Sequence, residues 1–310
     1  MIRLLFSAPP EDWPVWRPHL ERSCARAGLA VEIADRMDPA LVDYVAYSPG
    51  GGLRDFGAFP RLKAVLSLWA GVERIVGNPT IQVPLARMVD PGLRDGMTEY
   101  VTGHVLRHHL GTDAHVLGQD GVWRNDVVPP LARDRKVGVL GLGELGRAAA
   151  GALAGLGFDV AGWSRRPKAG LGFAAASGEA GLAEVLDRSE ILVLLLPATP
   201  ATEGLLDASR LALLPPGAVI VNPGRGSLID DDALLAALDA GLLGHATLDV
   251  FRQEPLPPEH PFWAHPKVTV TPHVASATRP ETAAEVVAEN LRRSEAGEAL
   301  LHLVDRAQGY

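Results

Sequence analysis

The segment from Val137 to Arg166 constrains the fold of this chain more than any other, because a glycine-rich turn and a helical stretch join two short apolar runs. Gly141 permits a tight turn after the first run, Gly143 lets a ligand approach the backbone, and Gly146 lets the next helix pack closely on the strand. The start of that helix offers free N–H groups and a positive dipole end to an anion. The order of strand, glycine turn, helix and strand predicts a dinucleotide site, with an ordinary strand–turn–helix corner or a related nucleoside site as the competing interpretations.

The residues at the end of the second apolar run indicate which dinucleotide binds. Enzymes that prefer NAD usually have Asp or Glu there, which accepts hydrogen bonds from the ribose hydroxyls. This chain has Ser164, Arg165 and Arg166 instead. A guanidinium binds a 2′-phosphate through paired charge-assisted hydrogen bonds, whereas a carboxylate repels it. We therefore predict NADPH in preference to NADH, the alternative being two solvated arginines on a surface turn.

Length and composition limit the class of protein. A chain of 310 residues with 47% hydrophobic residues is enough for about two domains with their own cores. A formal charge of −8 and the lack of a long basic run argue against nucleic-acid binding. No apolar run of about 18 residues occurs, so no membrane span is expected. The single cysteine, Cys24, excludes an internal disulfide and favours a reducing compartment, so we expect a cytoplasmic protein with a buried structural thiol.

Short apolar runs alternate with helical stretches along both halves of the chain, which predicts two parallel α/β domains. In the first half the expected strands are Arg3–Phe6, Val31–Ile33, Val42–Tyr47, Ala64–Leu68 and Val83–Val89. In the second half they are Val137–Leu140, Val160–Trp163, Ile191–Leu196, Ala218–Val221, Ala246–Asp249 and Val268–Thr271, the count of a doubly wound dinucleotide-binding sheet. Expected helices cover Trp13–Arg26, about Met97–Val116 and Glu281–Glu295, and a polar connector covers Gln119–Arg135.

These elements predict a Rossmann-type doubly wound parallel sheet in residues 97–274. Residues 1–96 and 275–310 are expected to form a smaller, flavodoxin-like α/β substrate domain, to which the last helix returns. We expect the two domains to enclose a cleft.

Three polar residues follow strands of the second half: Arg225, Glu254 and His273. Residues just past the carboxyl ends of parallel strands converge on one crevice, where ligands bind. A guanidinium binds a carboxylate and polarises an adjacent carbonyl, and an imidazole exchanges a proton with the product alkoxide. A carboxylate beside the imidazole orients the ring and favours its protonated form. Each residue alone has a structural explanation (a loop brace, a surface carboxylate, a hydrogen-bonded histidine), but their conjunction predicts a reaction site.

The motifs together resemble the D-isomer-specific 2-hydroxyacid dehydrogenases, and within that family the glyoxylate/hydroxypyruvate reductase A group. The resemblance is carried by Gly141–Gly146, Asn222–Asp230, Leu248–Phe251 with Glu254–Leu256, and Thr271–Ala275, and the narrower group by His260–Trp263 and Met97–Tyr100. It is strong from about residue 90 to residue 280 and weak before residue 60.

The resemblance implies roles for individual residues. Arg225 would hold the substrate, Glu254 would pair with His273, and His273 would be the acid/base. The implied substrate-binding residues are Trp69, Ala70, Gly71 and Val72, whose backbone amides would hold the carboxylate, together with Arg225 and His273. The implied cofactor-binding residues are Gly141, Gly143, Glu144, Leu145, Gly146, Ser164, Arg165, Arg166, Leu196, Pro197, Thr202, Pro223, Gly224 and Asp249. Homodimers are usual in this family.

The expected activity is the NADPH-dependent reduction of small 2-oxoacids, glyoxylate and hydroxypyruvate among them. Trp69 leaves the size of the pocket open, so an NADH-dependent reductase of an aryl or branched 2-oxoacid is one alternative. A non-catalytic regulator that senses nicotinamide cofactors on the same fold is another.

No metal site is expected. His104 and His108 have a zinc-like spacing but lack a third ligand, which favours a solvated helix face. The Asp230–Asp232 run precedes an expected helix, so N-capping explains it.

Overall fold

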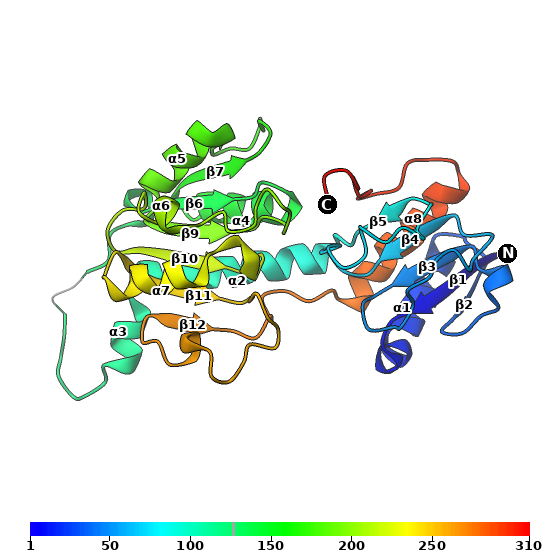
Figure 1. Cartoon of the computed structure of the whole chain (residues 1–310), viewed down its shortest axis with the longest axis horizontal. Helices are drawn as coiled ribbons and strands as arrows, with labels where there is room; N and C mark the ends of the chain where they lie inside the picture. Colours follow the sequence, from blue (N-terminus) through cyan, green and yellow to red (C-terminus); the bar gives the residue numbers. More distant parts are fainter. Residues whose placement is uncertain (126–127) are drawn as a thin grey trace. The chain divides into compact units, whose positions relative to one another are not determined.

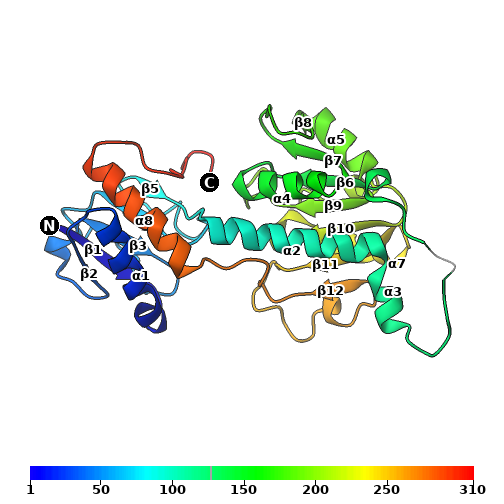
Figure 2. The same cartoon turned by 180° about the vertical axis from the view of Figure 1, so that it is seen from behind.

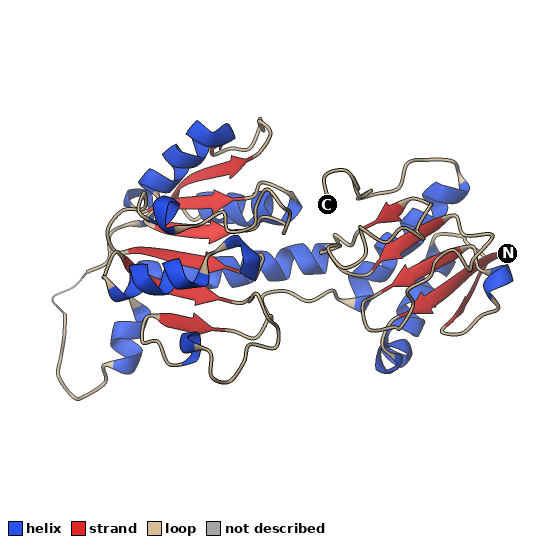
Figure 3. Ribbon diagram, in the orientation of Figure 1, coloured by secondary structure: helices blue, strands red, loops and turns tan. Residues whose placement is uncertain are grey.

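The computed structural model describes residues 1–125 and 128–310. The chain forms two compact units (Figure 1), the first made of Met1–Leu93 and Ala277–Tyr310 and the second of Arg94–Ser276. The sequence prediction placed these divisions after residue 96 and before residue 275. Each unit has its own hydrophobic clusters and its own parallel sheet (Figure 3).

The first unit contains a five-stranded parallel sheet with the strand order β2-β1-β3-β4-β5. This order, 2-1-3-4-5, is that of flavodoxin-like folds, as predicted. The strands are β1 (Ile2–Ser7), β2 (Val31–Ala34), β3 (Tyr44–Tyr47), β4 (Ala64–Ser67) and β5 (Leu85–Ala86). All five predicted strands are present, although β5 is much shorter than its apolar run.

Two helices cover one face of this sheet, α1 (Trp13–Arg26) and α8 (Pro280–Glu295). They lie side by side although they come from opposite ends of the chain (Figure 2). Small residues of α8, such as Ala284 and Ala288, pack with Leu20 of α1 in one buried cluster. The predicted return of the last helix to the first unit is therefore confirmed. Cys24 of α1 lies in the same cluster, where burial raises the pKa of its thiol to about 11, as expected for a structural cysteine.

The second unit contains a seven-stranded parallel sheet with the order β12-β11-β10-β9-β6-β7-β8. The strands are β6 (Lys136–Leu140), β7 (Asp159–Ser164), β8 (Ala174–Ser177), β9 (Ile191–Leu194), β10 (Ala218–Asn222), β11 (Leu243–Leu248) and β12 (Val268–Val270). Numbered within the unit, the order is 3-2-1-4-5-6 with a seventh strand at the far edge, which is the doubly wound Rossmann arrangement.

Helices cover both faces of this sheet. Leucines of α5 (Gly178–Arg188), α6 (Ala208–Leu211) and α7 (Asp231–Asp239) belong to one buried cluster, on the face turned to the viewer in Figure 1. Apolar residues of α2 (Pro91–Leu110) and α4 (Glu144–Gly155) belong to the other cluster, on the face seen in Figure 2. The remaining helix is α3 (Thr112–Leu117), and short 3₁₀ helices cover Pro10–Asp12, Pro39–Leu41, Ala132–Asp134, Gly226–Leu228 and Pro261–Trp263.

Two predicted elements of the second unit differ from the structure. The count of six strands was wrong, because β8 was missed: its Ala-Ala-Ala-Ser sequence lacks the β-branched and aromatic residues that mark a strand. The single helix expected over Met97–Val116 was also wrong. Gly111 adopts a left-handed conformation (φ 63°) and separates α2 from α3. The expected connector Gln119–Arg135 contains Asp126 and Val127, which lie outside the described residues.

The predicted N-cap at the start of α7 is confirmed. Asp230 caps α7, since its Oδ1 accepts a hydrogen bond of 2.9 Å from the backbone N–H of Ala233. None of the helices in the described part of the chain is long and apolar enough to span a membrane.

Candidate active site

The glycine turn after β6 has the geometry that the sequence predicted. Gly141 has a φ of +108°, and a Cβ atom there would lie 2.5 Å from the carbonyl oxygen of Leu195. A Cβ atom on Gly146 would lie 1.7 Å from the carbonyl oxygen of Gly141, so only glycine lets α4 approach this strand. Gly143 faces open space and provides no side-chain cap for α4. The first N–H groups of the helix are thus left for an anion, and the turn fits a dinucleotide pyrophosphate.

The first turn of α4 has an exposed and an apolar side. Glu144 forms an ion pair with Arg147 on the exposed side. Leu145 is partly buried and packs against the cluster beneath α4.

The turn after β7 presents two cations at the carboxyl end of the sheet. Ser164 is buried, and its Oγ donates a hydrogen bond of 2.7 Å to the carbonyl oxygen of Arg166. Arg165 and Arg166 are exposed. The serine therefore shapes the turn, and the position that holds a ribose-binding carboxylate in NAD-preferring enzymes has no negative charge here.

The loops after β9 and β10 lie against each other. Thr202 closes the first loop, because its Oγ1 donates a hydrogen bond of 2.7 Å to the carbonyl oxygen of Pro197. A Cβ atom on Gly224 would lie 2.8 Å from the carbonyl oxygen of Leu194 at the end of β9. Gly224 and Pro223 are buried, and so is Leu196. This close approach places the predicted cofactor residues of the two loops at the same edge of the sheet.

Arg225 follows Gly224 on the loop after β10. Its Nη1 donates a hydrogen bond of 2.6 Å to the Gly224 carbonyl oxygen. Asn222 braces the same loop, with its Oδ1 accepting from the Gly224 N–H at 3.1 Å and its Nδ2 donating to the Arg225 carbonyl oxygen at 2.9 Å. The guanidinium is therefore carried by a rigid loop at the carboxyl end of the sheet.

His273 and Glu254 form the pair that the sequence predicted. His273 Nδ1 lies 2.8 Å from Glu254 Oε2, and Glu254 Oε1 accepts a hydrogen bond of 2.9 Å from the Phe251 N–H. The carboxylate is therefore fixed through one oxygen and holds the imidazole through the other. This contact makes Nδ1 the donor to the carboxylate, which leaves Nε2 as the ring atom that can exchange a proton with a ligand.

Asp249 organises the loop that carries His273. Its carboxylate is fully buried and accepts hydrogen bonds from the N–H groups of Val274 and Ala275, both at 2.9 Å, and from Thr271 Oγ1 at 2.6 Å. The N–H of His273 donates to the Asp249 carbonyl oxygen at 2.8 Å. The sequence identified Asp249 only as a cofactor contact. That contact stays a prediction, and the structure adds a role in the fold of the loop.

His104 and His108 do not lie on a solvated helix face, so that prediction was wrong. Both are half-buried between α2 and the sheet, and His108 Nε2 lies 2.9 Å from Thr247 Oγ1 on β11. Burial lowers the pKa of His108 to about 3. The spacing of two histidines along a helix carries no information about the threonines of the strands that face it. Within residues 1–125 and 128–310, no three His, Cys, Asp or Glu side chains are grouped to hold a metal ion.

The loop from Trp69 to Val72 follows β4 in the first unit. The Trp69 carbonyl oxygen accepts a hydrogen bond of 3.0 Å from the Met88 N–H, and the Trp69 N–H donates to Ser67 Oγ at 3.2 Å. The indole is 44% exposed, whereas Val72 is buried. Ala70 and Gly71 lie between these anchors and are the part of the loop whose amides the sequence assigns to a carboxylate.

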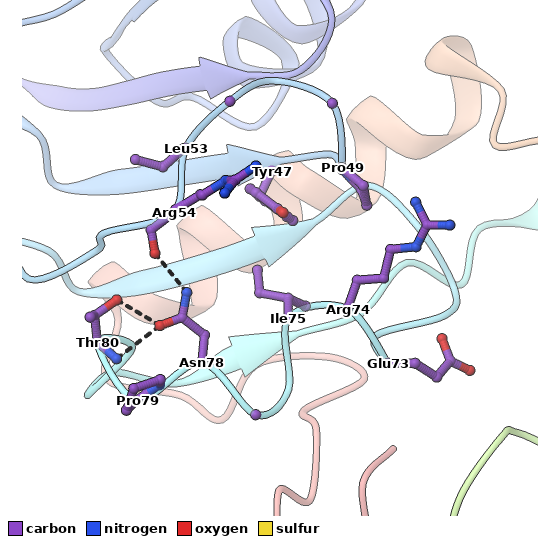
Figure 4. Close-up of a pocket in the computed structure, with 13 residues that line it drawn as sticks. Tyr47, Pro49, Leu53, Arg54, Glu73, Arg74, Ile75, Asn78, Pro79 and Thr80 are labelled. Atoms are coloured by element: carbon purple, nitrogen blue, oxygen red, sulfur yellow. Dashed lines mark hydrogen bonds between the residues drawn. The ribbon is translucent and has the colours of Figure 1, made fainter.

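A cavity of about 840 Å³ opens in the first unit beyond this loop (Figure 4). Its lining includes Glu73, the residue after Val72, and the arginines Arg54 and Arg74. None of the predicted substrate-binding residues lines it. At the other end of the cavity, Asn78 Nδ2 donates a hydrogen bond of 2.7 Å to the Arg54 carbonyl oxygen and so links two lining segments.

A doubly wound sheet with a phosphate-binding glycine turn, and a paired imidazole and carboxylate at its carboxyl edge, are features of the nicotinamide-dependent dehydrogenases. Comparison with known proteins agrees. Residues 102–275 match the NAD binding domain of the D-isomer specific 2-hydroxyacid dehydrogenases. A glyoxylate/hydroxypyruvate reductase A of Serratia proteamaculans is 42% identical over 259 residues, which are 81% of this chain and 82% of that protein.

Two solved structures are similar over nearly the whole chain. A D-isomer specific 2-hydroxyacid dehydrogenase of Xanthobacter autotrophicus, in complex with NADPH and MES, is 44% identical with a TM-score of 0.91 over 99% of both chains. An NADPH-dependent glyoxylate/hydroxypyruvate reductase of Sinorhizobium meliloti, with NADP and sulfate, is 36% identical with a TM-score of 0.86 over 100% of this chain and 99% of that one. This chain therefore belongs to the D-isomer specific 2-hydroxyacid dehydrogenase family, and it is an NAD(P)-dependent oxidoreductase. The predicted family and class of enzyme are confirmed.

Proposed function

We propose that the protein reduces small 2-oxoacids with NADPH, converting glyoxylate to glycolate and hydroxypyruvate to glycerate. The observation that carries the proposal is the contact of 2.8 Å between His273 Nδ1 and Glu254 Oε2, on loops that leave the carboxyl edge of the Rossmann sheet. The names of the relatives in Serratia and Sinorhizobium support this choice of substrates.

Each polar residue has a step that its chemistry suits. Arg225 binds the carboxylate of the 2-oxoacid and polarises the neighbouring carbonyl, which stabilises the negative charge that develops on oxygen. His273 gives the proton on Nε2 to that oxygen, and Glu254 keeps the protonated ring oriented. The reduced nicotinamide, when bound, supplies the hydride to the keto carbon. In the reverse direction, His273 takes the proton from the hydroxyl group of a 2-hydroxyacid.

The Trp69–Val72 loop contributes to binding of the substrate carboxylate in this proposal. The support comes from Gly71, which lies between anchored residues and gives the backbone freedom to direct amides at an anion. Trp69 is 44% exposed and leaves the pocket size open, so the choice of small acids over aryl ones rests on the names of the relatives.

The preference for NADPH rests on the turn after β7. Ser164 takes the place of the ribose-binding carboxylate, and the exposed Arg165 and Arg166 supply positive charge for a 2′-phosphate. The nicotinamide cofactors in the two solved structures described above carry that phosphate.

The test is the rate of absorbance loss of NADPH, and in parallel of NADH, with glyoxylate, hydroxypyruvate, pyruvate and phenylpyruvate. We expect the largest kcat/KM for the two small acids with NADPH. A preference for phenylpyruvate would contradict the proposed choice of small acids, and NADPH binding without turnover of any acid would favour a sensor of nicotinamide cofactors.

The cofactor assignment has its own test in the double variant Ser164→Asp with Arg165→Ala. It should lower the ratio of kcat/KM with NADPH to that with NADH by about tenfold or more, since a carboxylate replaces a guanidinium next to the 2′-phosphate. An unchanged ratio would refute this part of the proposal.

We also propose that the protein acts as a homodimer in the cytoplasm. The single, buried Cys24 suits a reducing compartment. Sedimentation velocity at micromolar concentration tests the dimer.

A further inference from the structure

A row of hydroxyl groups connects helix α2 to the buried carboxylate beneath the His273 loop. The phenol oxygen of Tyr100 on α2 lies 2.7 Å from Thr271 Oγ1, and Thr271 Oγ1 lies 2.6 Å from Asp249 Oδ1. Asp249 in turn accepts the N–H groups of Val274 and Ala275, the two residues that follow His273. Tyr100 is therefore two hydrogen bonds away from the carboxylate that shapes this loop.

The direction of these hydrogen bonds follows from the chemistry of the groups. Asp249 is an acceptor as a carboxylate, so the single hydroxyl hydrogen of Thr271 is donated to it. Thr271 Oγ1 then has only lone pairs left for Tyr100, which must be the donor. Burial raises the pKa of Tyr100 to about 12, so the phenol keeps its hydrogen throughout the neutral range.

We propose that Tyr100 is a positioning residue for catalysis, acting through Thr271 and Asp249 on the backbone that holds His273. The proposal rests on the proposed function, in which His273 is the acid/base. The donated phenol hydrogen polarises the Thr271 hydroxyl and strengthens its bond to Asp249. The carboxylate thereby keeps the amides of Val274 and Ala275 in place, and the imidazole keeps its distance to Glu254.

The loop needs such support because His273 has a φ of 55°, a left-handed conformation that costs about 1 kcal/mol or more for a residue with a side chain. Its N–H contacts two carbonyl oxygens, those of Asp249 at 2.8 Å and Thr271 at 3.0 Å. The hydrogen bonds that start at Tyr100 thus lead to Thr271 and Asp249, the two residues whose carbonyl oxygens accept from the His273 N–H.

Other charged and titratable groups face the same region. The His104 ring lies 4.4 Å from the Tyr100 ring, and burial lowers the pKa of His104, so it stays neutral. Arg107 donates to Thr269 Oγ1 at 2.9 Å and is paired with Asp113. These groups keep their contacts when the phenol oxygen alone is removed, which makes Tyr100→Phe a specific probe.

The matched control is Tyr44→Phe in the first unit. Tyr44 is buried, whereas Tyr100 is partly buried, and Tyr44 donates its phenol hydrogen to Glu295 Oε1 at 2.5 Å but belongs to neither the site nor its loops. Both variants lose one partly buried hydrogen bond. We expect a lower Tm for both, whereas only Tyr100→Phe should lower kcat for glyoxylate with NADPH, by about fivefold, with KM for NADPH unchanged within twofold.

The pH profile separates positioning from a merely structural role. In Tyr100→Phe the alkaline limb of the kcat profile for reduction should move to lower pH, because a less fixed ring is held less firmly by Glu254 in its protonated state. Thr271→Val should show the same shift, Thr271→Ser should not, and the double variant Tyr100→Phe with Thr271→Val should be no worse than Thr271→Val alone. A wild-type kcat and profile in Tyr100→Phe would overturn the proposal, and so would additive effects of the two substitutions.

Hydrogen exchange keeps the proposal testable even if no 2-oxoacid is reduced. The amides of residues 273–275 should exchange at least threefold faster in Tyr100→Phe than in the wild type, and at the wild-type rate in Tyr44→Phe. Unchanged exchange in Tyr100→Phe would overturn the positioning role. Absence of turnover in the wild type, with faster exchange in the variant, would refute only the proposed function.

Discussion

His273 carries the proposed acid–base chemistry in a backbone conformation that few residues with side chains adopt (φ 55°). The cost is offset by local hydrogen bonds and by the Glu254 carboxylate, which is itself fixed by the Phe251 N–H. A residue in this conformation on a loop just past a strand is typical of functional sites, where the surrounding structure determines the geometry.

We predict that His273→Ala lowers kcat for glyoxylate reduction by about 10²–10⁴-fold, the usual contribution of a general acid. The Kd for NADPH, measured by fluorescence titration, should change by less than threefold, because the ring is not among the proposed cofactor contacts. Undiminished turnover would remove His273 from its role.

Glu254→Gln should leave His273 in place but stabilise its protonated ring less, because a neutral amide replaces the carboxylate. The alkaline limb of the reduction profile should then move to lower pH, while activity at pH 6 falls less than activity at pH 8. The control is Glu259→Gln, an exposed carboxylate on the same segment. Equal losses at both pH values would argue that Glu254 only supports the loop.

The elements of the second unit meet through glycines and through polar side chains. Gly146 brings α4 against the strand that ends at the glycine turn. Thr247 of β11 contacts His108 of α2, and Thr269 of β12 contacts Arg107 of the same helix. The close approach of α4 can be predicted from the sequence because it requires a glycine. The contacts of α2 with the threonines cannot be, because they depend on which strands, distant in the chain, pack against that helix.

Gly146→Ala tests the close approach of α4. The added Cβ has no room, so we expect a loss of about 1–3 kcal/mol in the free energy of unfolding and at least a tenfold weaker Kd for NADPH. Gly151→Ala in the same helix is the control. Its Cβ meets no atom within 4 Å, and the substitution should stabilise the protein by about 0.5–1 kcal/mol. Similar behaviour of the two variants in urea unfolding and NADPH titration would contradict this account.

The histidines between α2 and the sheet make stability depend on pH. Burial lowers the pKa of His108 to about 3 and that of His245 to about 4 in the folded protein, against about 6.5 in the unfolded chain. The unfolded state therefore binds more protons below pH 6.5. The stability that these two neutral, buried rings allow is therefore fully present above about pH 6.5, and it is lost as the pH falls below that value.

His108→Gln should reduce the loss of unfolding free energy between pH 6.5 and pH 4.5, measured by urea titration. The exposed His115 provides the control variant His115→Gln, which should keep the wild-type dependence. A wild-type slope in His108→Gln would show that other groups cause the loss.

The whole molecule consists of two parallel α/β units whose candidate residues fall into separate sets. The cofactor and acid–base residues belong to Arg94–Ser276, and the Trp69–Val72 loop belongs to the other unit. The first and last parts of the chain build one sheet-and-helix core, because α8 packs beside α1.

This division predicts a stepwise pattern in hydrogen exchange. NADPH alone should protect the amides around 141–146, 164–166 and 196–202 in the second unit. Addition of tartronate, a non-reducible 2-hydroxy dicarboxylate used as a substrate analogue, should then protect residues 69–73 as well. Protection of residues 69–73 by NADPH alone would place the cofactor differently from the proposal.

The class of enzyme and most of the strands follow from local features of the sequence. Gly141, Gly143 and Gly146, placed between a strand and a helix, predict a phosphate-binding turn, because the steric requirement at such a turn is local. The apolar runs likewise specified all strands but β8, whose alanines carry no strand signal. Arg225, Glu254 and His273 were visible because each lies on the loop that follows a strand of the second unit.

Which side chains complete these local features depends on how distant elements pack. The contact of 2.8 Å between His273 and Glu254, the three hydrogen bonds to the Asp249 carboxylate and the link to Tyr100 join residues from different elements. The same holds for His108, whose spacing on a helix predicted a solvated face until β11 placed Thr247 against it. Periodicity and turn chemistry act within a few residues, whereas burial and hydrogen-bond partners depend on which elements pack together, and that is set by the sheet order.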